Sequence, residues 1–153
     1  MASNWEAFQF LLGEWQGGQE GDPDQGYGTF SFTFELNENI LVRKNRTIFA
    51  ATLDRKGHTH EDLLIIYAES AGQKRAIYFD NEEHVIHYAV TISPDQKNII
   101  LESAPVPSSP QFRFTYFKTG EDSLEAWFEM APPGQPGAYF MYLKGPAKRV
   151  SVK

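Results

Sequence analysis

The chain has 153 residues, with 20 acidic and 14 basic side chains, and its formal net charge is −6 at pH 7. The basic residues are scattered, with no cluster long enough to follow a phosphate backbone, so nucleic acid is not expected as a partner. There is no cysteine, which excludes disulfides, thiolate nucleophiles and Cys-based zinc sites.

The remaining composition favours one β-rich domain that spans residues 1–153. Hydrophobic residues make up 41% and charged residues 22% of the chain, as in ordinary globular proteins, but aromatic residues reach 14%. Aromatic side chains favour the pleated, half-buried surface of a sheet. The first 15 residues contain neither a basic leader nor a long apolar run, so we expect a soluble cytoplasmic protein that does not enter a membrane.

A short helix is predicted at the N-terminus. Ser3 and Glu6 form a capping-box pattern, and apolar residues then recur at helical spacing from Trp5 to Leu12. The following segment, GGQEGDPDQGYG, is rich in Gly, Asp and Pro and predicts a loop.

Alternating apolar and polar residues predict a series of strands. The clearest alternation is TFSFTFEL, residues 29–36. Further candidate strands are 40–49, 62–68, 74–80, 84–92, 98–103, 111–118, 123–130 and 138–144, with a short last one at 147–152. Their connections are mostly turn-like and none has room for a crossover helix, so the strands should form an antiparallel meander. About 8–10 such strands close most economically into a β-barrel, and a two-sheet sandwich is the alternative.

The start of the chain carries a resemblance. The segment FLLGEWQGG, with Gly13 and Trp15, resembles the Gly-x-Trp opening of lipocalin-like (calycin) β-barrels. Over nearly its full length, including LVRKNR, LLIIYAE, RAIYFDNEEHVIHY and LKGPAKRV, the chain is similar to an uncharacterised bacterial lipocalin-like family related to nitrobindins. The resemblance implies a closed barrel with an internal pocket for a small, largely apolar ligand. It also implies that Trp15 packs under Lys148 or Arg149, and a guanidinium over an indole gains cation–π energy.

The relation to nitrobindins implies heme as an alternative ligand. Nitrobindin-like barrels bind heme through a histidine near the C-terminal strands, whereas residues 88–153 of this chain contain no histidine. Tyr139, Met141 and Tyr142 lie in the corresponding part of the sequence, but nothing assigns any of them as an axial ligand. We therefore expect no cofactor.

The histidines do not predict a metal site. His84 and His87 are three residues apart on a predicted strand, so they point to opposite faces and cannot share one metal ion. His58, His60 and Asp62 share a face in an extended segment, but the surrounding letters DRKGHTHED are typical of a solvated turn and offer only two imidazoles. We expect no metal at these histidines, and of His84 and His87 one should lie at the surface and the other be buried or line a cavity.

The apolar faces of the strands predict the inner wall of the barrel. The strongest candidates for inward-facing side chains are Phe30, Phe32, Phe34, Ile77, Phe79, Phe112, Phe114, Tyr116, Leu124, Ala126, Phe128 and Met130. On the opposite faces of the strands 111–118 and 123–130, cross-strand ion pairs are expected on the outside. The residues on these faces are Arg113, Thr115, Glu125, Trp127 and Glu129, of which Arg113, Glu125 and Glu129 carry a charge.

The strand ILVRKNRTIF, residues 40–49, places a cation on the inner side whichever of its faces points inward. A buried cation requires a partner or an anionic ligand. Arg43 and Asn45 would form a fork for a ligand carboxylate, or Arg43 pairs internally with an acid such as Asp62 or Glu35. The predicted ligand-binding residues are Arg43, Asn45, Tyr67, Tyr78, His87, Tyr88 and Tyr116.

We interpret the chain as a non-enzymatic barrel that binds a small hydrophobic or amphipathic molecule, with a carboxylate as one option for its polar end. The alternative from another class is an enzyme that acts on such a molecule with His84 or His87 as general base. A third is a barrel filled by its own side chains, whose surface contacts proteins. No catalytic residue is assigned, and the sequence is compatible with a monomer or a homodimer.

Overall fold

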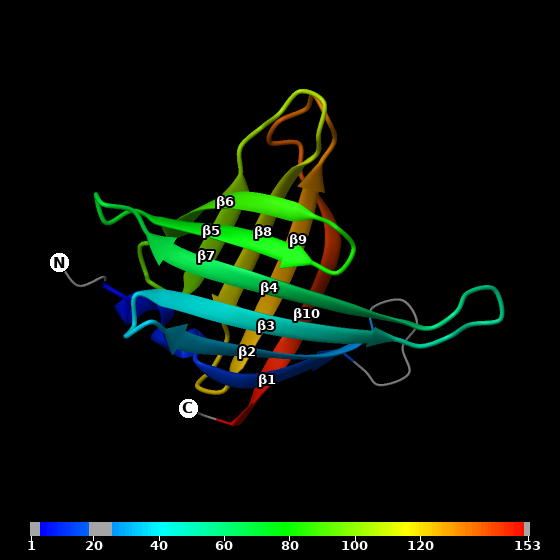
Figure 1. Ribbon diagram of the computed structural model, residues 1–153, viewed down its shortest axis with the longest axis horizontal. Helices are drawn as coiled ribbons and strands as arrows, with labels where there is room; N and C mark the ends of the chain where they lie inside the picture. Colours follow the sequence, from blue (N-terminus) through cyan, green and yellow to red (C-terminus); the bar gives the residue numbers. More distant parts are fainter. Residues whose placement is uncertain (1–3, 19–25, 152–153) are drawn as a thin grey trace.

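The computed structural model describes residues 4–18 and 26–151, and within them ten antiparallel strands form a closed barrel (Figure 1). The short 3-10 helix η1, Glu6–Leu11, precedes the first strand. The strands are β1 Gly13–Gly18, β2 Tyr27–Glu35, β3 Ile40–Phe49, β4 His58–Ala68, β5 Lys74–Asp80, β6 Val85–Ile92, β7 Asn98–Ser103, β8 Gln111–Lys118, β9 Ser123–Ala131 and β10 Phe140–Ser151. Consecutive strands are neighbours, and β1 meets β10. The predicted all-β meander barrel is therefore confirmed, and the sandwich alternative is wrong.

Several element boundaries differ from the prediction. The strand expected at 62–68 begins at His58, because its first residues continue the ladder with β3 instead of forming a solvated turn. The two strands expected at 138–144 and 147–152 are one strand, β10, with an irregularity in its pairing between Met141 and Leu143. Ser3 of the predicted capping box lies outside the described residues, and the side chain of Asn4 accepts a hydrogen bond from the Glu6 backbone N–H at 3.0 Å.

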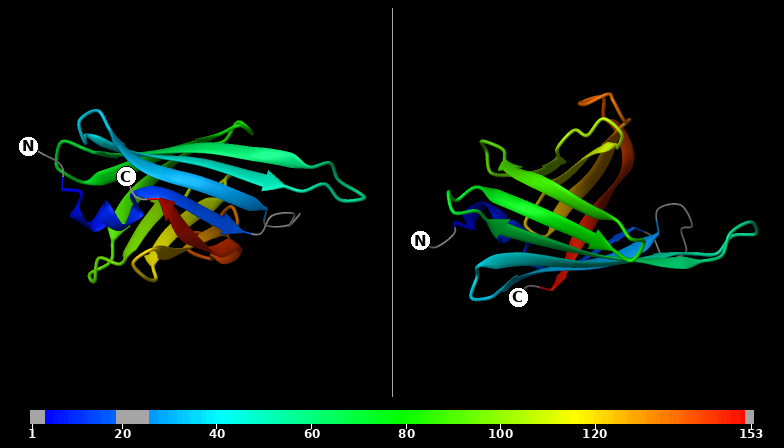
Figure 2. Two further views of the ribbon diagram at one scale, coloured as in Figure 1. Left: turned by 90° about the horizontal axis from the view of Figure 1, so that it is seen from below. Right: turned by 45° about the horizontal axis from the view of Figure 1, so that its top comes forward.

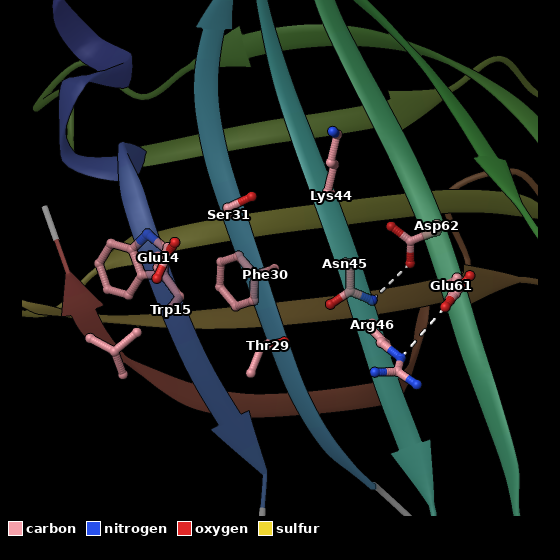
Figure 3. A pocket seen from close by; sticks show the side chains of 11 residues that line it. Glu14, Trp15, Thr29, Phe30, Ser31, Lys44, Asn45, Arg46, Glu61 and Asp62 are labelled. Carbon is pink, nitrogen blue, oxygen red and sulfur yellow. Dashed lines mark hydrogen bonds and ion pairs between the residues drawn. The ribbon is translucent and has the colours of Figure 1, made fainter. Parts of the chain in front are cut away.

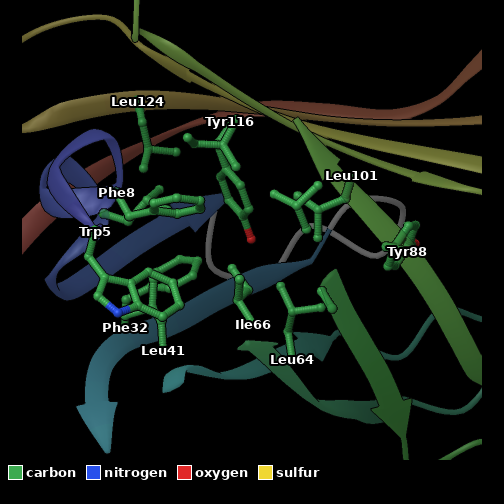
Figure 4. Packing of buried hydrophobic residues seen from close by; sticks show 14 of the residues in the cluster. Trp5, Phe8, Phe32, Leu41, Leu64, Ile66, Tyr88, Leu101, Tyr116 and Leu124 are labelled. Atoms are coloured by element: carbon green, nitrogen blue, oxygen red, sulfur yellow. The ribbon is translucent and has the colours of Figure 1, made fainter. Parts of the chain in front are cut away.

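One end of the barrel is closed by η1 and filled by apolar side chains (Figure 4). Trp5 packs edge-on against Phe8 and Phe34, with ring centroids 5.3 and 5.6 Å apart, and its indole N–H donates to the Glu38 carbonyl in the β2–β3 turn at 2.8 Å. The largest side chains of the buried cluster below it are Phe8, Leu11, Trp15, Phe32, Leu41, Leu64, Ile66, Ile99, Leu101, Tyr116 and Leu124. The β3–β4 hairpin projects beyond the opposite end (Figure 2).

The inner wall agrees with the prediction except on β5. Phe30, Phe34, Phe112, Phe114 and Ala126 pack against the buried cluster, as expected. Ile77 and Phe79 were expected to face inward, and this is wrong. The register that pairs Ile66 with Ala76 and Leu64 with Tyr78 turns those two β5 side chains inward and leaves Phe79 39% exposed on the outer face.

The first and last strands are joined by a short seam, defined by the pairs Glu14–Ser151, Trp15–Arg149, Gln16–Lys148 and Gly17–Ala147. On its other side β10 pairs with β9 from Phe140 onward. Among the described residues, the first half of β10 therefore has a strand neighbour on one side only. Pro146, which lacks a backbone donor, lies where the seam ends.

Arg149 anchors the seam to η1. Its guanidinium carbon lies 4.3 Å from the centre of the Trp15 ring, and Nη2 donates to the Phe10 carbonyl at 2.9 Å. Nη1 donates to the Leu12 carbonyl, and Nε pairs with Asp122 at 2.9 Å. The Trp15 contact implied by the resemblance is thus made by Arg149, while Lys148 is exposed.

The outer face also follows the expected pattern on β8 and β9. Arg113 and Glu129 are paired in register and form a two-pronged ion pair with both N–O distances at 2.9 Å.

Within residues 4–18 and 26–151, no helix has the length and apolar character needed to cross a membrane.

Candidate functional site

The half of the interior away from η1 has two chemically different walls. Strands β8–β10 supply aromatic rings that face inward yet remain partly exposed. Phe112 and Phe128 are stacked with centroids 5.8 Å apart and an interplanar angle of 10°, Phe114 lies 5.9 Å from Phe128, and Tyr142 packs edge-on against Phe128 at 5.8 Å. An inward-facing ring that stays accessible indicates that this half is not completely filled by the core.

The facing wall, on β3–β5, is polar. Residues of alternate positions share one face of a strand, so Arg43 and Asn45 of β3, His60 and Asp62 of β4, and Tyr78 of β5 all point inward. The strand register aligns them, since Asn45 pairs with Asp62 and the neighbouring Leu64 pairs with Tyr78. Charged and hydrogen-bonding groups are thereby concentrated on one side of the interior.

Arg43 lies at the centre of this wall and is 5% exposed. It forms an ion pair with Asp62, and its Nη1 donates to the Tyr116 hydroxyl at 2.5 Å. Asn45 donates to the second Asp62 oxygen at 2.9 Å. The predicted fork of Arg43 and Asn45 therefore exists, but the chain's own Asp62 carboxylate fills it, as in the internal-pair alternative.

One donor of Arg43 is not satisfied. Its Nε is buried and has no hydrogen-bond partner among the described residues. The guanidinium carbon lies 5.4 Å from the centre of the Phe114 ring, so the cation lies between the polar and the aromatic walls. Because a buried unpaired donor is destabilising by about 1–3 kcal/mol, this position is suited to a hydrogen-bond acceptor that comes from outside the chain.

His60 extends the network towards the mouth of the barrel. Its Nε2 lies 3.0 Å from Asp62 Oδ2 and 3.1 Å from the Tyr78 hydroxyl, and its Nδ1 lies 2.7 Å from Glu82. The hydrogen bond to Asp62 raises the pKa of His60, and partial burial lowers it by less. With the further hydrogen bond to Glu82, the pKa of His60 is raised to about 9. The imidazole is therefore cationic at neutral pH and donates from both nitrogens.

The carboxylates of the network are held in the ionised form. Burial alone would raise the pKa of Asp62, but the charge of Arg43 and the hydrogen bonds from His60 and Asn45 bring it below its usual range. The Tyr78 hydroxyl donates to Asp80 at 3.0 Å. Burial would also raise the pKa of Asp80, but the backbone N–H groups of His84 and Glu82 lower it.

Asp80 organises the turn between β5 and β6. One of its oxygens accepts from the backbone N–H groups of Glu82 and His84 at 2.8 and 3.0 Å, and the other lies 2.9 Å from the His84 ring. His84 is exposed, and its ring contacts Asp80 within this turn. No group of three or more His, Cys, Asp or Glu residues in the described parts of the chain is arranged to hold a metal ion.

Of the seven predicted ligand-binding residues, five face the interior of the barrel and two face outward. Arg43, Asn45, Tyr78, Tyr88 and Tyr116 face the interior, and Tyr88 and Tyr116 are buried. Tyr67 and His87 lie on the outer face instead, because their neighbours Ile66 and Tyr88 occupy the inner one. His87 is exposed beside Ile77 of β5.

The sequence pattern did not predict His60 and Asp80 as parts of the network. The signal was present, since His58, His60 and Asp62 occupy alternate positions, but their polarity was interpreted as a turn. Of the residues considered for heme, Tyr139 donates to Glu102 at 2.6 Å and lies under Arg113, away from the interior.

A hollow of about 610 Å³ lies against β1–β4 (Figure 3). Most of its lining side chains belong to the outer face: Glu14, Thr29, Ser31, Lys44, Arg46, Glu61 and Val150. Arg46 and Glu61 pair across it at 3.5 Å, and both are well exposed. The hollow opens to the outer surface, and its lining also includes four residues whose side chains point inward, Trp15, Phe30, Asn45 and Asp62.

Comparisons with known proteins assign no family. No family model matches the chain, and no curated protein matches it. Among solved structures, a protein of unknown function from the DUF3598 family of Nostoc punctiforme aligns with 98% of this chain and 100% of its own, at 11% identity and a TM-score of 0.33.

Proposed function

We propose that the chain is a lipocalin-like binding barrel that holds a small, mainly apolar ligand in the half of the interior away from η1. The ligand's apolar body packs on Phe112, Phe114 and Phe128, and a polar atom at its other end meets the wall of Arg43 and Tyr78. The Gly13-x-Trp15 opening, with Arg149 over the indole, supports the lipocalin-like assignment.

The observation that carries the proposal is the unsatisfied Nε of Arg43. Native proteins leave few buried donors without partners, and such a group is normally satisfied by an ordered water or by an acceptor atom of a ligand. Here the unpaired donor lies beside accessible aromatic rings, which is the combination of apolar lining and a few oriented polar groups that small-molecule sites use.

The enzyme alternative has less support. His87 lies on the outer face and His84 is engaged by Asp80 at the turn. His60 faces the interior, but its raised pKa keeps it protonated at neutral pH, so it lacks the free lone pair of a general base. A binding role requires none of these groups to transfer a proton.

Titration with the neutral fluorophore 2-naphthol tests the proposal. We expect saturable binding to the wild-type protein and roughly tenfold weaker binding to Phe128→Ala, which removes the ring that contacts all the others in the aromatic wall. The matched control is Phe117→Ala, because Phe117 packs against Trp127 on the outer face of the same two strands. Absence of binding to the wild type, or equal loss in both variants, would contradict the proposal.

A further inference from the structure

We propose that Asp62 occupies an anion-binding site inside the barrel and thereby makes the barrel select neutral ligands over carboxylate ligands. The inference concerns ligand class and, in that respect, rests on the proposed binding function. The anion site itself is defined by the chain alone.

Three donors from two adjacent strands converge on the Asp62 carboxylate. Arg43 donates to Oδ1, while Asn45 and His60 approach Oδ2 at 2.9 and 3.0 Å. A guanidinium with a second donor on the other oxygen is the arrangement that proteins use to bind the carboxylate of a ligand. The Asp62 side chain is 4% exposed, so its carboxylate occupies the anion site as a buried part of the barrel wall.

The charges around the site oppose a second anion. The cations that face it are Arg43 and His60, and the carboxylates are Asp62, Asp80 and Glu82, with the exposed His84 held on Asp80. The lowered pKa values of Asp62 and Asp80 keep both ionised at neutral pH. A ligand carboxylate would add a negative charge beside the buried, ionised Asp62, whose cationic partners Arg43 and His60 are already engaged.

A neutral acceptor meets no such opposition. The unpaired Arg43 Nε provides one N–H, which suits a carbonyl, ether or hydroxyl oxygen. The same cation cannot offer a new ligand the two-pronged contact that carboxylates prefer, because Asp62 and Tyr116 already occupy its other nitrogens. The site therefore accepts one hydrogen-bonding oxygen and rejects a full anion.

Removing the Asp62 carboxylate should open the anion site. In Asp62→Ala we expect a lower melting temperature that sodium acetate raises by several degrees over sodium chloride at equal ionic strength. Acetate should not stabilise the wild type. The matched control is Asp122→Ala, which also removes an aspartate paired with an arginine, but one whose side chain is 70% exposed. Equal effects of acetate on Asp62→Ala, the control and the wild type would overturn the inference.

Asp62→Asn provides a test that preserves the shape of the side chain. We expect the wild type to bind 2-naphthol and to bind 2-naphthoate roughly tenfold more weakly or not at all, and Asp62→Asn to reduce this preference by about tenfold. Equal affinity of the wild type for both probes would overturn the selectivity. If neither probe binds any variant, the proposed ligand function fails, whereas acetate rescue of Asp62→Ala would still support the anion site.

Discussion

At the scale of single residues, Arg43 and Asp62 depend on each other, because each is almost fully buried and each carries a charge. In Arg43→Met the Asp62 carboxylate keeps its burial but loses its main partner. We expect the free energy of unfolding, measured with urea, to fall by about 3–5 kcal/mol. Arg46→Met is the control, since the exposed Arg46–Glu61 pair should contribute about 0–1 kcal/mol.

The double variant Arg43→Met/Asp62→Leu separates the pair from its surroundings. Replacing both charges with apolar groups removes the unpaired anion, so most of the lost stability should return. If Arg43→Met were as stable as Arg46→Met, Asp62 would have to be well solvated without its partner, which would contradict this prediction.

His60 predicts a dependence of stability on pH. Its pKa in the folded protein is raised to about 9, above the ordinary value near 6.5. Its contribution is therefore fully present below about pH 6.5 and is lost as the pH rises through about 9. We expect His60→Asn to lower the free energy of unfolding near pH 6 by about 1 kcal/mol, a modest value because the imidazole is partly solvated, and to have no such effect near pH 10.

The measurement is urea unfolding of both proteins at the two pH values, together with an NMR titration of the His60 ring. A titration midpoint near 6.5 would contradict the network as described.

At the scale of elements, η1 is fastened to the barrel by Arg149, which donates to carbonyls at the end of the helix and stacks on Trp15. Arg149→Ala should lower the free energy of unfolding by about 2–4 kcal/mol, because it removes several charge-assisted hydrogen bonds at once. Arg149→Lys should not restore the loss, since an ammonium group cannot make the planar fork.

Lys148→Ala is the matched control for this contact. Lys148 is exposed on the same strand, so its replacement should change stability by no more than about 0.5 kcal/mol. Urea unfolding of both variants is followed by tryptophan fluorescence. Equal effects of the Arg149 and Lys148 substitutions would show that η1 is held by apolar packing alone.

At the scale of the whole molecule, the barrel was predictable because most strands have one clearly apolar face. The prediction failed on β5, whose letters KRAIYFD are apolar on both faces, so periodicity could not choose between Ile77 and Tyr78. The Arg43–Asp62 pair could be foreseen because every register of residues 40–49 buries a cation. The role of His60 could not be foreseen, because a strand whose inner face is polar near the mouth of a barrel has the same sequence pattern as a solvated turn.

The short seam between β1 and β10 has a consequence for how the barrel assembles. Every other strand pairing joins neighbours in the sequence, whereas the seam brings together segments more than a hundred residues apart. Closing such a long loop carries a larger entropic penalty than forming a hairpin, and among the described residues four residue pairs, together with the contacts of Arg149, offset it. The β1–β10 pairing is therefore expected to form last during folding and to break first during unfolding. The nine pairings between consecutive strands would still be in place at that stage.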